Sequence, residues 1–551
     1  MNRNNERHFN QIPQMKANRT RFNRDQTILT TFDAGKLIPF YVDEVLPGDT
    51  FSVDTAAIIR MTTPKYPVMD DSFIDFYYFF CPNRILWDNF KHFMGEVEET
   101  PWMPTKAYSV PQIKINGTNA KPAPDERSIL DYMGVPTKVK KPFSINALPI
   151  RAYTRIWNEF FRDENVDNAA VLKTDDADVN YEFGDENLIQ EAENNAYKGG
   201  NLLPVNKFHD YFTSCLPYPQ RGPDVTLPMS GNAPVSLYGP GKAGKATKYG
   251  TANTYEDGTI FSYLNEGAIL GTSSGNGSTK FTFEDGSESP GAYAYADLNQ
   301  VTAATINDLR KAVAVQQYYE ALARGGSRYR EQVQTLWNVV ISDKTVQVPE
   351  YLGGGRYHVN INQIVQTTEN DKSPLGETGA MSVTPINESS FTKSFEEHGF
   401  VIGVCCVRHN RSYQQGLERF WSREDRLDYY VPQFANIGEQ PVKKKEIMLT
   451  GEASDEETFG YQEAWADYRM KPNRVSGLMR SNATGTLDFW HYGDYYESVP
   501  TLSQEWMAEG KKEIARTLVV ENEPQFFGAI RVANKTTRRM PLYSVPGLYK
   551  L

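Results

Sequence analysis

The sequence predicts a mainly β protein, a sandwich of antiparallel strands with long loops and a few helices, and three observations support this fold class. Aromatic residues make up 13% of the 551 residues, with 32 Tyr and 29 Phe, and rings favour pleated sheets. The chain also contains 32 Pro and 40 Gly, which indicate many turns. Short apolar runs bounded by turn residues recur along the chain, a pattern typical of β domains.

The predicted strands are spread over most of the chain. Between Leu37 and Pro64, apolar residues lie in short runs interrupted by Pro and Gly, which is a strand-and-turn pattern. Ser72 to Phe80 reads SFIDFYYFF and predicts a strand that is buried on both faces. The later strand candidates are Arg328–Ser342, Tyr357–Gln366, Phe400–Arg408 and Thr486–Tyr492.

Two segments have the periodicity of helices. Leu148 to Phe161 places apolar and aromatic residues at helical spacing, with Pro149 near its start. Thr305 to Ala323 begins with a capping residue, carries an apolar face and is followed by Gly325. Both helices are expected in connections between strands.

Charge and cysteine content limit the function class. The net charge is −11 and the pI is about 5.4, which argues against a surface that binds nucleic acid everywhere. No apolar run approaches the roughly 18 residues that span a bilayer, so we expect no membrane insertion. The N-terminus lacks the apolar region of a secretory signal. The four Cys include the adjacent Cys405 and Cys406, which favour a buried strand in a reducing cytoplasm.

The sequence divides into four predicted parts. Residues 1–30 form an arm that is basic in an otherwise acidic chain. Residues 31–221 and 301–551 carry the two parts of the core, the second with long loops and a C-terminal extension. Residues 222–300 form a surface insertion, since 13 glycines lie between Gly222 and Gly291. Scattered aromatic residues favour an ordered insertion over a linker.

The stretch from Gly399 to Pro432 combines an apolar strand with a concentration of Arg and aromatic side chains. These residue types are enriched in the cores of protein interfaces. The alternative is a core helix whose arginine side chains extend to solvent. Composition alone leaves both interpretations open. The candidate interface residues are Arg408, Arg411, Arg419, Phe420, Trp421 and Arg423.

Several motifs that could indicate chemistry are incomplete. Val235 to Thr247 matches GxGxxG and nearly matches a phosphate-binding loop ending in Lys245, but Ala246 replaces the Ser or Thr that holds magnesium. No helix is expected after it. Gly271, Ser273 and Gly275 match a nucleophile elbow without its strand and helix. We therefore predict no catalytic residue and no cofactor.

Metal and phosphate motifs are equally incomplete. Asp176, Asp178 and Asn180 resemble the start of a calcium loop, but Tyr181 and Asn187 replace its Gly and Glu. An irregular surface calcium site stays open, although no metal ligand is predicted. The run from Lys443 to Lys445 could contact phosphates, but a solvated loop is the simpler interpretation.

Longer blocks of sequence resemble a known family. They are NQIPQMKANRTRFNRDQT near the start, GKLIPFYVDEVLPGDTFSVDTAAIIRMTTPKYPVMDDSF, FCPNRILWDNFKHFMGE (Phe80–Glu96), EHGFVIGVCCVRHNRSYQQGLERFWSR, IGEQPV and FGYQEAWADYRMKPNRVSGLMRS (Phe459–Ser481). In this order they resemble the major capsid protein of the Microviridae, small single-stranded DNA phages, and most closely the gokushovirus branch. The resemblance spans about residues 10 to 500, and the Gly-rich segment matches only in position and character.

The resemblance implies an eight-stranded antiparallel jelly roll that assembles into the simplest (T=1) icosahedral shell. The shell would enclose circular single-stranded DNA in the virion and would assemble in the cytoplasm of a bacterial host. The insertion at 222–300 would project outward near threefold axes and could contact a host receptor. The implied partners are further copies of the chain, the packaged DNA, an internal basic DNA-binding protein and a scaffolding protein.

The basic arm has two interpretations within this family. Five side chains could meet phosphates or stack on a base, and they are Lys16, Arg19, Arg21, Phe22 and Arg24. Alternatively, the arm ties neighbouring subunits together, with its Arg residues paired to carboxylates, and this interpretation is slightly favoured. Outside the family, the alternatives are a carbohydrate-binding β-sandwich protein, suggested by abundant Tyr and Trp, and a nucleotide hydrolase that uses Gly239 to Lys245.

Overall fold

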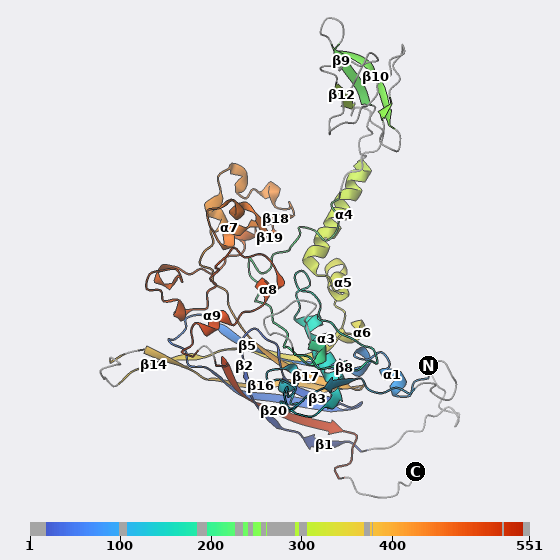
Figure 1. Cartoon of the computed structure of the whole chain (residues 1–551), viewed down its shortest axis with the longest axis vertical. Coiled ribbons are helices and arrows are strands. Elements are labelled where there is room, and N and C mark those ends of the chain that lie inside the picture. The colour runs from blue at the N-terminus through green and yellow to red at the C-terminus, as the bar shows by residue number, and fades with distance from the viewer. Residues whose placement is uncertain are drawn as a thin grey trace. The chain divides into compact units, whose positions relative to one another are not determined.

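The computed structural model describes residues 18–97, 107–183, 196–225, 306–367, 375–376, 378–520 and 523–543, together with the backbone of four strands between 235 and 296. These residues form two compact units (Figure 1). The first unit comprises Met1–Pro219 and Ala323–Leu551, and the second comprises Gln220–Leu322.

One antiparallel sheet of the first unit joins the two ends of the chain. Its central strands are β20 (Phe526–Arg538) and β4 (Thr50–Met61), which pair with each other. The edge strand β16 (Thr384–Ser394) pairs with β4. On the other side, β1 (Thr20–Asn23) and β2 (Gln26–Phe32) both pair with β20. Sequence reasoning missed β20, although its inward and outward residues alternate with the period of two that a half-buried strand requires.

A second antiparallel sheet lies against the first. Its strands follow the order β13-β5-β17-β3, with bounds Glu350–His358, Ser72–Pro82, Gly399–His409 and Ile38–Val45. The predicted strands Ser72–Phe80 and Phe400–Arg408 are confirmed as β5 and β17. The predicted strand-and-turn region 37–64 contains β3 and β4, and Tyr357–Gln366 contains the end of β13 and all of β14 (Ile361–Val365).

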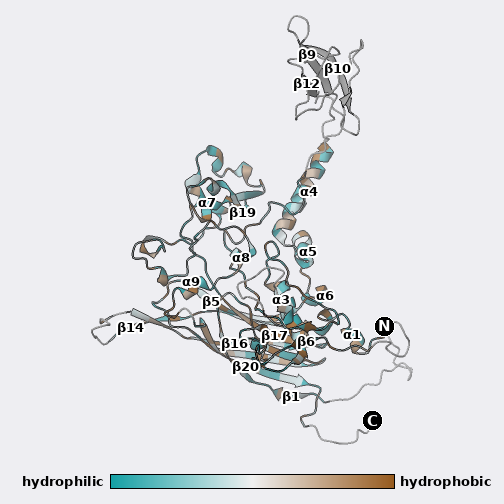
Figure 2. Ribbon diagram, viewed as in Figure 1, coloured by the Kyte–Doolittle hydropathy of each residue, from teal (hydrophilic) through white to brown (hydrophobic). Residues whose placement is uncertain are grey.

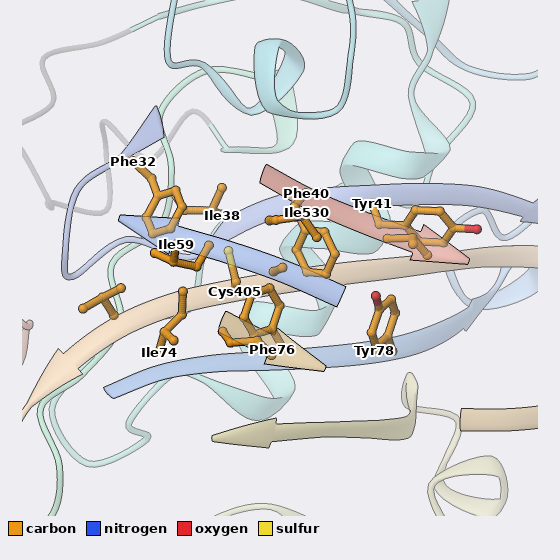
Figure 3. Close-up of a cluster of buried hydrophobic side chains, with 14 of the residues drawn as sticks. Phe32, Ile38, Phe40, Tyr41, Ile59, Ile74, Phe76, Tyr78, Cys405 and Ile530 are labelled. Atoms are coloured by element: carbon orange, nitrogen blue, oxygen red, sulfur yellow. The ribbon is translucent and has the colours of Figure 1, made fainter. Parts of the chain in front are cut away.

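The main core lies between these two sheets. Phe32, Ile59 and Ile530 from the first sheet face Ile38, Phe76 and Cys405 from the second (Figure 3). All six side chains are buried. Burial of one such large apolar side chain stabilises a fold by about 2 kcal/mol. The prediction of a mainly β protein with packed antiparallel sheets is therefore confirmed.

A third layer covers the outer face of the second sheet. Alternate residues of β17 face opposite ways, so that Val401 and Cys405 enter the main core while Ile402 and Cys406 face α3 (Leu148–Phe160). Because both faces of β17 are covered, its sequence is apolar without alternation. The predicted helix Leu148–Phe161 is confirmed as α3, whose Trp157 is buried against this sheet.

The remaining strands form small sheets. In the first unit, β6, β7 and β8 form one sheet, β14 pairs with β15, and β18 pairs with β19. Their bounds are Gln112–Ile115, Phe143–Asn146, Val179–Asn180, Ile361–Val365, Thr378–Ser382, Glu439–Lys443 and Thr458–Glu463. In the second unit, the sheet order is β11-β10-β9-β12. These strands are β9 (Val235–Pro240), β10 (Ala246–Thr254), β11 (Ile260–Phe261) and β12 (Tyr293–Ala296).

Most helices other than α3 and α4 are short. They are α1 (Phe90–Phe93), α2 (Ile129–Tyr132), α5 (Tyr329–Trp337), α6 (Asp343–Val346), α7 (Lys444–Ile447), α8 (Gln504–Met507) and α9 (Lys512–Ala515). The predicted helix at Thr305–Ala323 is confirmed as α4 (Ile306–Gly325), which contains the boundary between the units. Figure 2 shows apolar and polar residues mixed along α4, and its Ile306, Leu309 and Val313 are exposed. None of the described helices combines the length and apolarity that a membrane crossing requires.

Two predicted strands are wrong. Arg328–Ser342 contains helix α5, because Tyr329, Val333 and Trp337 recur at helical spacing and Glu331 caps the start. Asn338 then adopts a left-handed conformation that ends the helix. Thr486–Tyr492 contains a short 3₁₀ turn instead of a strand. Its Phe489 and Trp490 rings stack on Tyr66 with centroids 4.8 and 5.2 Å away, so packing of the rings replaces sheet pairing.

Candidate assembly surfaces

The described part of the basic arm belongs to the first sheet. Thr20 to Asn23 form β1, which pairs with the end of β20. Arg24 donates two hydrogen bonds to the Asp43 carboxylate, at 2.7 and 2.6 Å. Such a two-point contact fixes the guanidinium in orientation as well as in position. Arg24 therefore stabilises the attachment of the arm to its own subunit.

The other candidate arm residues differ in accessibility. Arg19 is exposed and donates to the Gly48 carbonyl and to Thr50 Oγ1, at 2.9 and 2.8 Å. Arg21 is exposed, whereas Phe22 is half-buried. Lys16 lies outside the described residues. Arg19 and Arg21 are thus the described members of this set that a partner could reach.

The first two candidate interface arginines are held inside their own chain. Arg408 forms an ion pair with the buried Asp75, which also binds Arg356. Arg411 is only 4% exposed, and its guanidinium contacts Asp494 at 2.8 Å and Glu509 at 2.5 Å. A buried cation is stable only when it is paired in this way. These two arginines stabilise the subunit.

The carboxylates around Arg411 form a connected buried cluster. Glu509 also contacts His409, with 2.7 Å between Oε1 and Nδ1, and Lys207 lies 3.7 Å from Asp494. Burial alone would raise the pKa of Asp494, but Arg411 and Lys207 outweigh burial and hold it below its usual range. The pKa of Glu509 is lowered for the same reason, by Arg411 and His409. Asp494 and Glu509 are therefore ionised at neutral pH.

The last two candidate arginines are partly buried beneath their loop. Arg419 donates to the Pro441 carbonyl at 3.1 Å. Arg423 pairs with Asp467, and its guanidinium lies 4.3 Å from the centre of the Tyr468 ring. Both contacts hold the loop that follows β17 against the β18–β19 region of the same subunit.

By contrast, the aromatic candidates are exposed. Phe420 is 39% exposed and Trp421 is 67% exposed. They begin a group of exposed apolar residues that we call the 420–437 patch, which consists of Phe420, Trp421, Leu427, Tyr429, Tyr430, Phe434 and Ile437. Neighbouring exposed rings of this kind mark sites of interaction with another molecule. Leu427, Phe434 and Ile437 were not predicted, because sequence gives little sign that an apolar side chain is exposed.

The phosphate-loop motif is followed by a strand, whereas a nucleotide-binding site of this kind requires a helix at that position. Ala246 to Thr254 form β10, which pairs with β9 on the other side of the motif. A strand takes the place of the helix terminus that would bind phosphate, in agreement with the expectation that no helix follows the motif. Lys245 itself and the Gly271–Gly275 motif lie outside the described residues.

The other weak motifs have structural partners. Asp176 accepts hydrogen bonds from Trp87 and Asn89, and Asp178 pairs with Lys114 at 2.8 Å. Within the described residues, no group of three or more His, Cys, Asp or Glu is arranged to hold a metal ion. The run at 443–445 pairs with Glu456 and Glu457. The four cysteines are buried and free.

These features define a class of protein: an antiparallel β sandwich that carries exposed aromatic residues suited to association. Comparison with known proteins gives the family. A family model described as "Capsid protein (F protein)" matches residues 10–548, and the chain belongs to this family. It is a phage capsid protein of Microviridae type, and hence a structural protein rather than an enzyme.

Three relatives support this assignment over nearly their whole length. The chain is 38% identical to capsid protein VP1 of Chlamydia phage 1, covering 98% of each chain. It is 36% identical to VP1 of Bdellovibrio phage phiMH2K, covering 99% of this chain and 98% of the relative. It is also 36% identical to VP1 of Spiroplasma virus 4, covering 95% and 94%. The family predicted from the collinear blocks is confirmed.

Proposed function

We propose that this capsid protein forms a T=1 icosahedral shell around circular single-stranded DNA, and that its two main sheets are the halves of an eight-stranded jelly roll. The strand order carries the second part of the proposal. We number the eight main strands from one to eight along the chain, in the order β2, β3, β4, β5, β13, β16, β17 and β20. In these numbers the strand order is 1-8-3-6 in the first sheet and 2-7-4-5 in the second. Two interleaved Greek keys produce this order.

The 420–437 patch supports association with a second copy of the chain. A closed shell needs each subunit to bury several surfaces against its neighbours, and aromatic side chains contribute most to such contacts. Phe420 and Trp421 stay in the interface proposal as direct contacts. Arg419 and Arg423 take part by supporting the patch from beneath, whereas Arg408 and Arg411 act inside the subunit.

The outward face of the first sheet supports a role in DNA contact. Arg531 and Lys535 are exposed on β20, and Arg21 lies on the adjacent β1. Arg60 is exposed on β4, opposite Phe527. Successive outward residues of a strand are about 6.6 Å apart, which is close to the spacing of phosphates in an extended single strand. Arg19 and Arg21 would extend this surface from the arm.

The second unit, Gln220–Leu322, is proposed to project from the shell and to contact the host. Its sheet and the exposed apolar residues of α4 provide surfaces for local contacts between copies or for a receptor. Assembly in the host cytoplasm, with a scaffolding protein and an internal basic protein as partners, completes the proposal.

Expression of the chain alone tests the shell directly. Electron microscopy and analytical ultracentrifugation should detect closed shells, or pentameric intermediates on the way to them. A protein that stays monomeric at high concentration and hydrolyses ATP would overturn the proposal.

Deletion of residues 1–17, combined with Arg19→Ala and Arg21→Ala, separates the two roles of the arm. The deletion leaves β1 and the Arg24–Asp43 pair in place, so the subunit should fold normally. Less DNA in each particle, at an unchanged particle yield, would support contact with phosphates. Fewer particles with unchanged DNA content would support a tie between subunits instead.

A further inference from the structure

We infer that a cleft on the outer face of the second sheet binds a small anionic ring compound, the chemistry shared by acidic sugars and nucleoside monophosphates. The cleft has a volume of about 810 Å³. Its walls come from β5, β13 and β17, from the end of α3 and from the segment that precedes α5. Ligand sites in proteins usually enclose about 300 to 1,000 Å³, so a molecule of one or two rings fits this size.

Cations outnumber carboxylates in the lining of the cleft, although Asp75 and Asp494, which do not line it, pair with three of these cations. Six of its lining residues are Arg or Lys and three are Asp or Glu, against a net charge of −11 for the protein. A concave surface focuses the field of such groups and attracts anions. Exposed guanidinium donors in this lining, above all those of Arg356, therefore favour a ligand with a carboxylate or a phosphate.

Two arginines, on the strands β13 and β17 that flank β5, provide the anion contact. Arg356 uses Nε and Nη2 to bind Asp75, at 2.7 and 3.1 Å, and its side chain stays 49% exposed. Arg408 pairs with the same carboxylate, so two cations share one anion. The Nε of Arg408 is buried, so the accessible donors belong to Arg356. A guanidinium carries five N–H donors and Arg356 binds Asp75 through Nε and Nη2, so its Nη1 remains for a ligand oxygen.

Aromatic side chains beside these arginines provide surfaces for a ring. The Phe208 ring lies 4.4 Å from the Arg356 guanidinium and 4.3 Å from that of Arg408, which holds both cations beside the cleft. Tyr351 is partly exposed and contacts Tyr77, with ring centroids 6.3 Å apart. The Phe208 ring is covered by these guanidinium groups, so the exposed Tyr351 ring is the one that can pack against the apolar face of a sugar or against a nucleobase. The cleft thus combines the two elements that an anionic ring compound requires.

The position of the cleft in the fold indicates which source could supply the ligand. Tyr77 and Phe79, which line the cleft, pack with α3 and not in the core between the sheets. The basic arm lies in the other sheet, across that core. If the arm faces DNA, as proposed above, the cleft opens to the exterior, where acidic sugars of a cell surface are the available source. This last step rests on the proposed function, whereas the anion chemistry does not.

Ligand-observed NMR and calorimetry on the full-length protein test the inference, with glucuronic acid, dAMP and uncharged glucose as probes. We expect an anionic probe to bind and glucose not to bind. Arg356→Gln should weaken binding about tenfold or more, because it removes a charged hydrogen-bond donor. Binding of glucuronic acid assigns the cleft to acidic sugars, and binding of dAMP alone assigns it to nucleotides.

Arg84→Gln is the matched control. Arg84 binds Glu397 through the same Nε and Nη2 atoms, at 2.6 and 3.2 Å, outside the cleft. This control should bind the probe like the unmodified protein. Tyr351→Leu, which leaves the ion pairs intact, should also weaken binding and covers the case in which Arg356→Gln fails to fold. Absence of anion binding, or equal loss in both arginine variants, would overturn the inference. Shell formation is scored separately by electron microscopy, so that a failure to assemble is not taken for a failure to bind.

Discussion

The two halves of the stretch from the end of β17 to Ile437 use the same residue types for opposite purposes. Arg411 lies in the interior and Arg408 is half-buried beside the cleft, and each is paired with carboxylates of its own chain. Phe420 and Trp421, about ten residues later, are exposed with no comparable burial. The difference teaches that an enrichment in Arg and aromatic residues does not by itself indicate an interface. The two halves differ because carboxylates from distant parts of the chain pair with the arginines of the first half, whereas no core element in the described part of the chain covers the rings of the second half.

The largest expected effect comes from the buried half. Arg411→Ala removes the cation between Asp494 and Glu509 and leaves two buried carboxylates without it. Loss of one partner of a buried ion pair costs about 3 to 5 kcal/mol. The free energy of unfolding, measured by denaturant titration of the unassembled subunit, should fall by this amount.

Arg426→Ala serves as the control for that measurement. Arg426 is exposed within the same stretch, so its removal should change stability by less than about 0.5 kcal/mol. If both variants lose the same free energy of unfolding, the buried cluster does not stabilise the subunit more than an exposed arginine does. The proposed difference between the two halves would then be wrong.

The exposed half should show the reverse behaviour. The double variant Phe420→Ala, Trp421→Ala should leave the unfolding midpoint of the subunit nearly unchanged, because both side chains are exposed in the single chain. Its shell yield should fall sharply, since central aromatic contacts contribute about 2 kcal/mol or more each to an interface. Sedimentation of assembly reactions measures the yield. A normal yield would remove the 420–437 patch from the set of subunit contacts.

The ionised cluster also predicts a pH dependence. The pKa values of Asp494 and Glu509 are lower in the folded subunit than in the unfolded chain, so their contribution is present above about pH 4 and is lost as the pH falls below it. Each carboxylate can contribute at most about 1.4 kcal/mol per pH unit. Stability measured from pH 6 down to 2 should therefore fall less steeply for Asp494→Asn than for the unmodified protein. Parallel slopes would count against ionisation of Asp494.

Local sequence patterns predicted the central elements well. β5 and β17 were recognisable because they are covered on both faces, and α3 because its apolar residues recur at helical spacing. The β20 strand was missed, and residues 328–342 were predicted as a strand although Tyr329, Val333 and Trp337 have helical spacing. Pairing of β20 with β4 joins residues more than 450 positions apart, and no local pattern reveals such a contact.

The candidate sites were predicted less completely. Sequence identified Arg411 but not its partners, since Asp494 is 83 positions away and ordinary carboxylates give no sign of burial. Arg24 was assigned to DNA or to a neighbour, whereas its carboxylate is Asp43 of the same chain. Phe208 and Arg356 were not noticed at all, because they come together only through the packing of separate elements.

The smallest expected effect concerns the phosphate-loop motif. Lys245→Ala should leave shell yield and subunit stability unchanged, since the motif is followed by β10 and lacks a helix to bind phosphate. Particle counts and unfolding curves matched to those of the unmodified protein provide the measurement. A loss of assembly that ATP analogues modulate would revive the nucleotide interpretation.

The most direct test is an electron cryo-microscopy map of assembled particles, in which the exposure of individual side chains is compared with that in the single chain. The account predicts that Phe420 and Trp421 are covered by a neighbouring copy while Arg411 keeps its contacts with Asp494 and Glu509. A shell in which the 420–437 patch faces solvent, or in which Arg411 pairs with a different subunit, would contradict it.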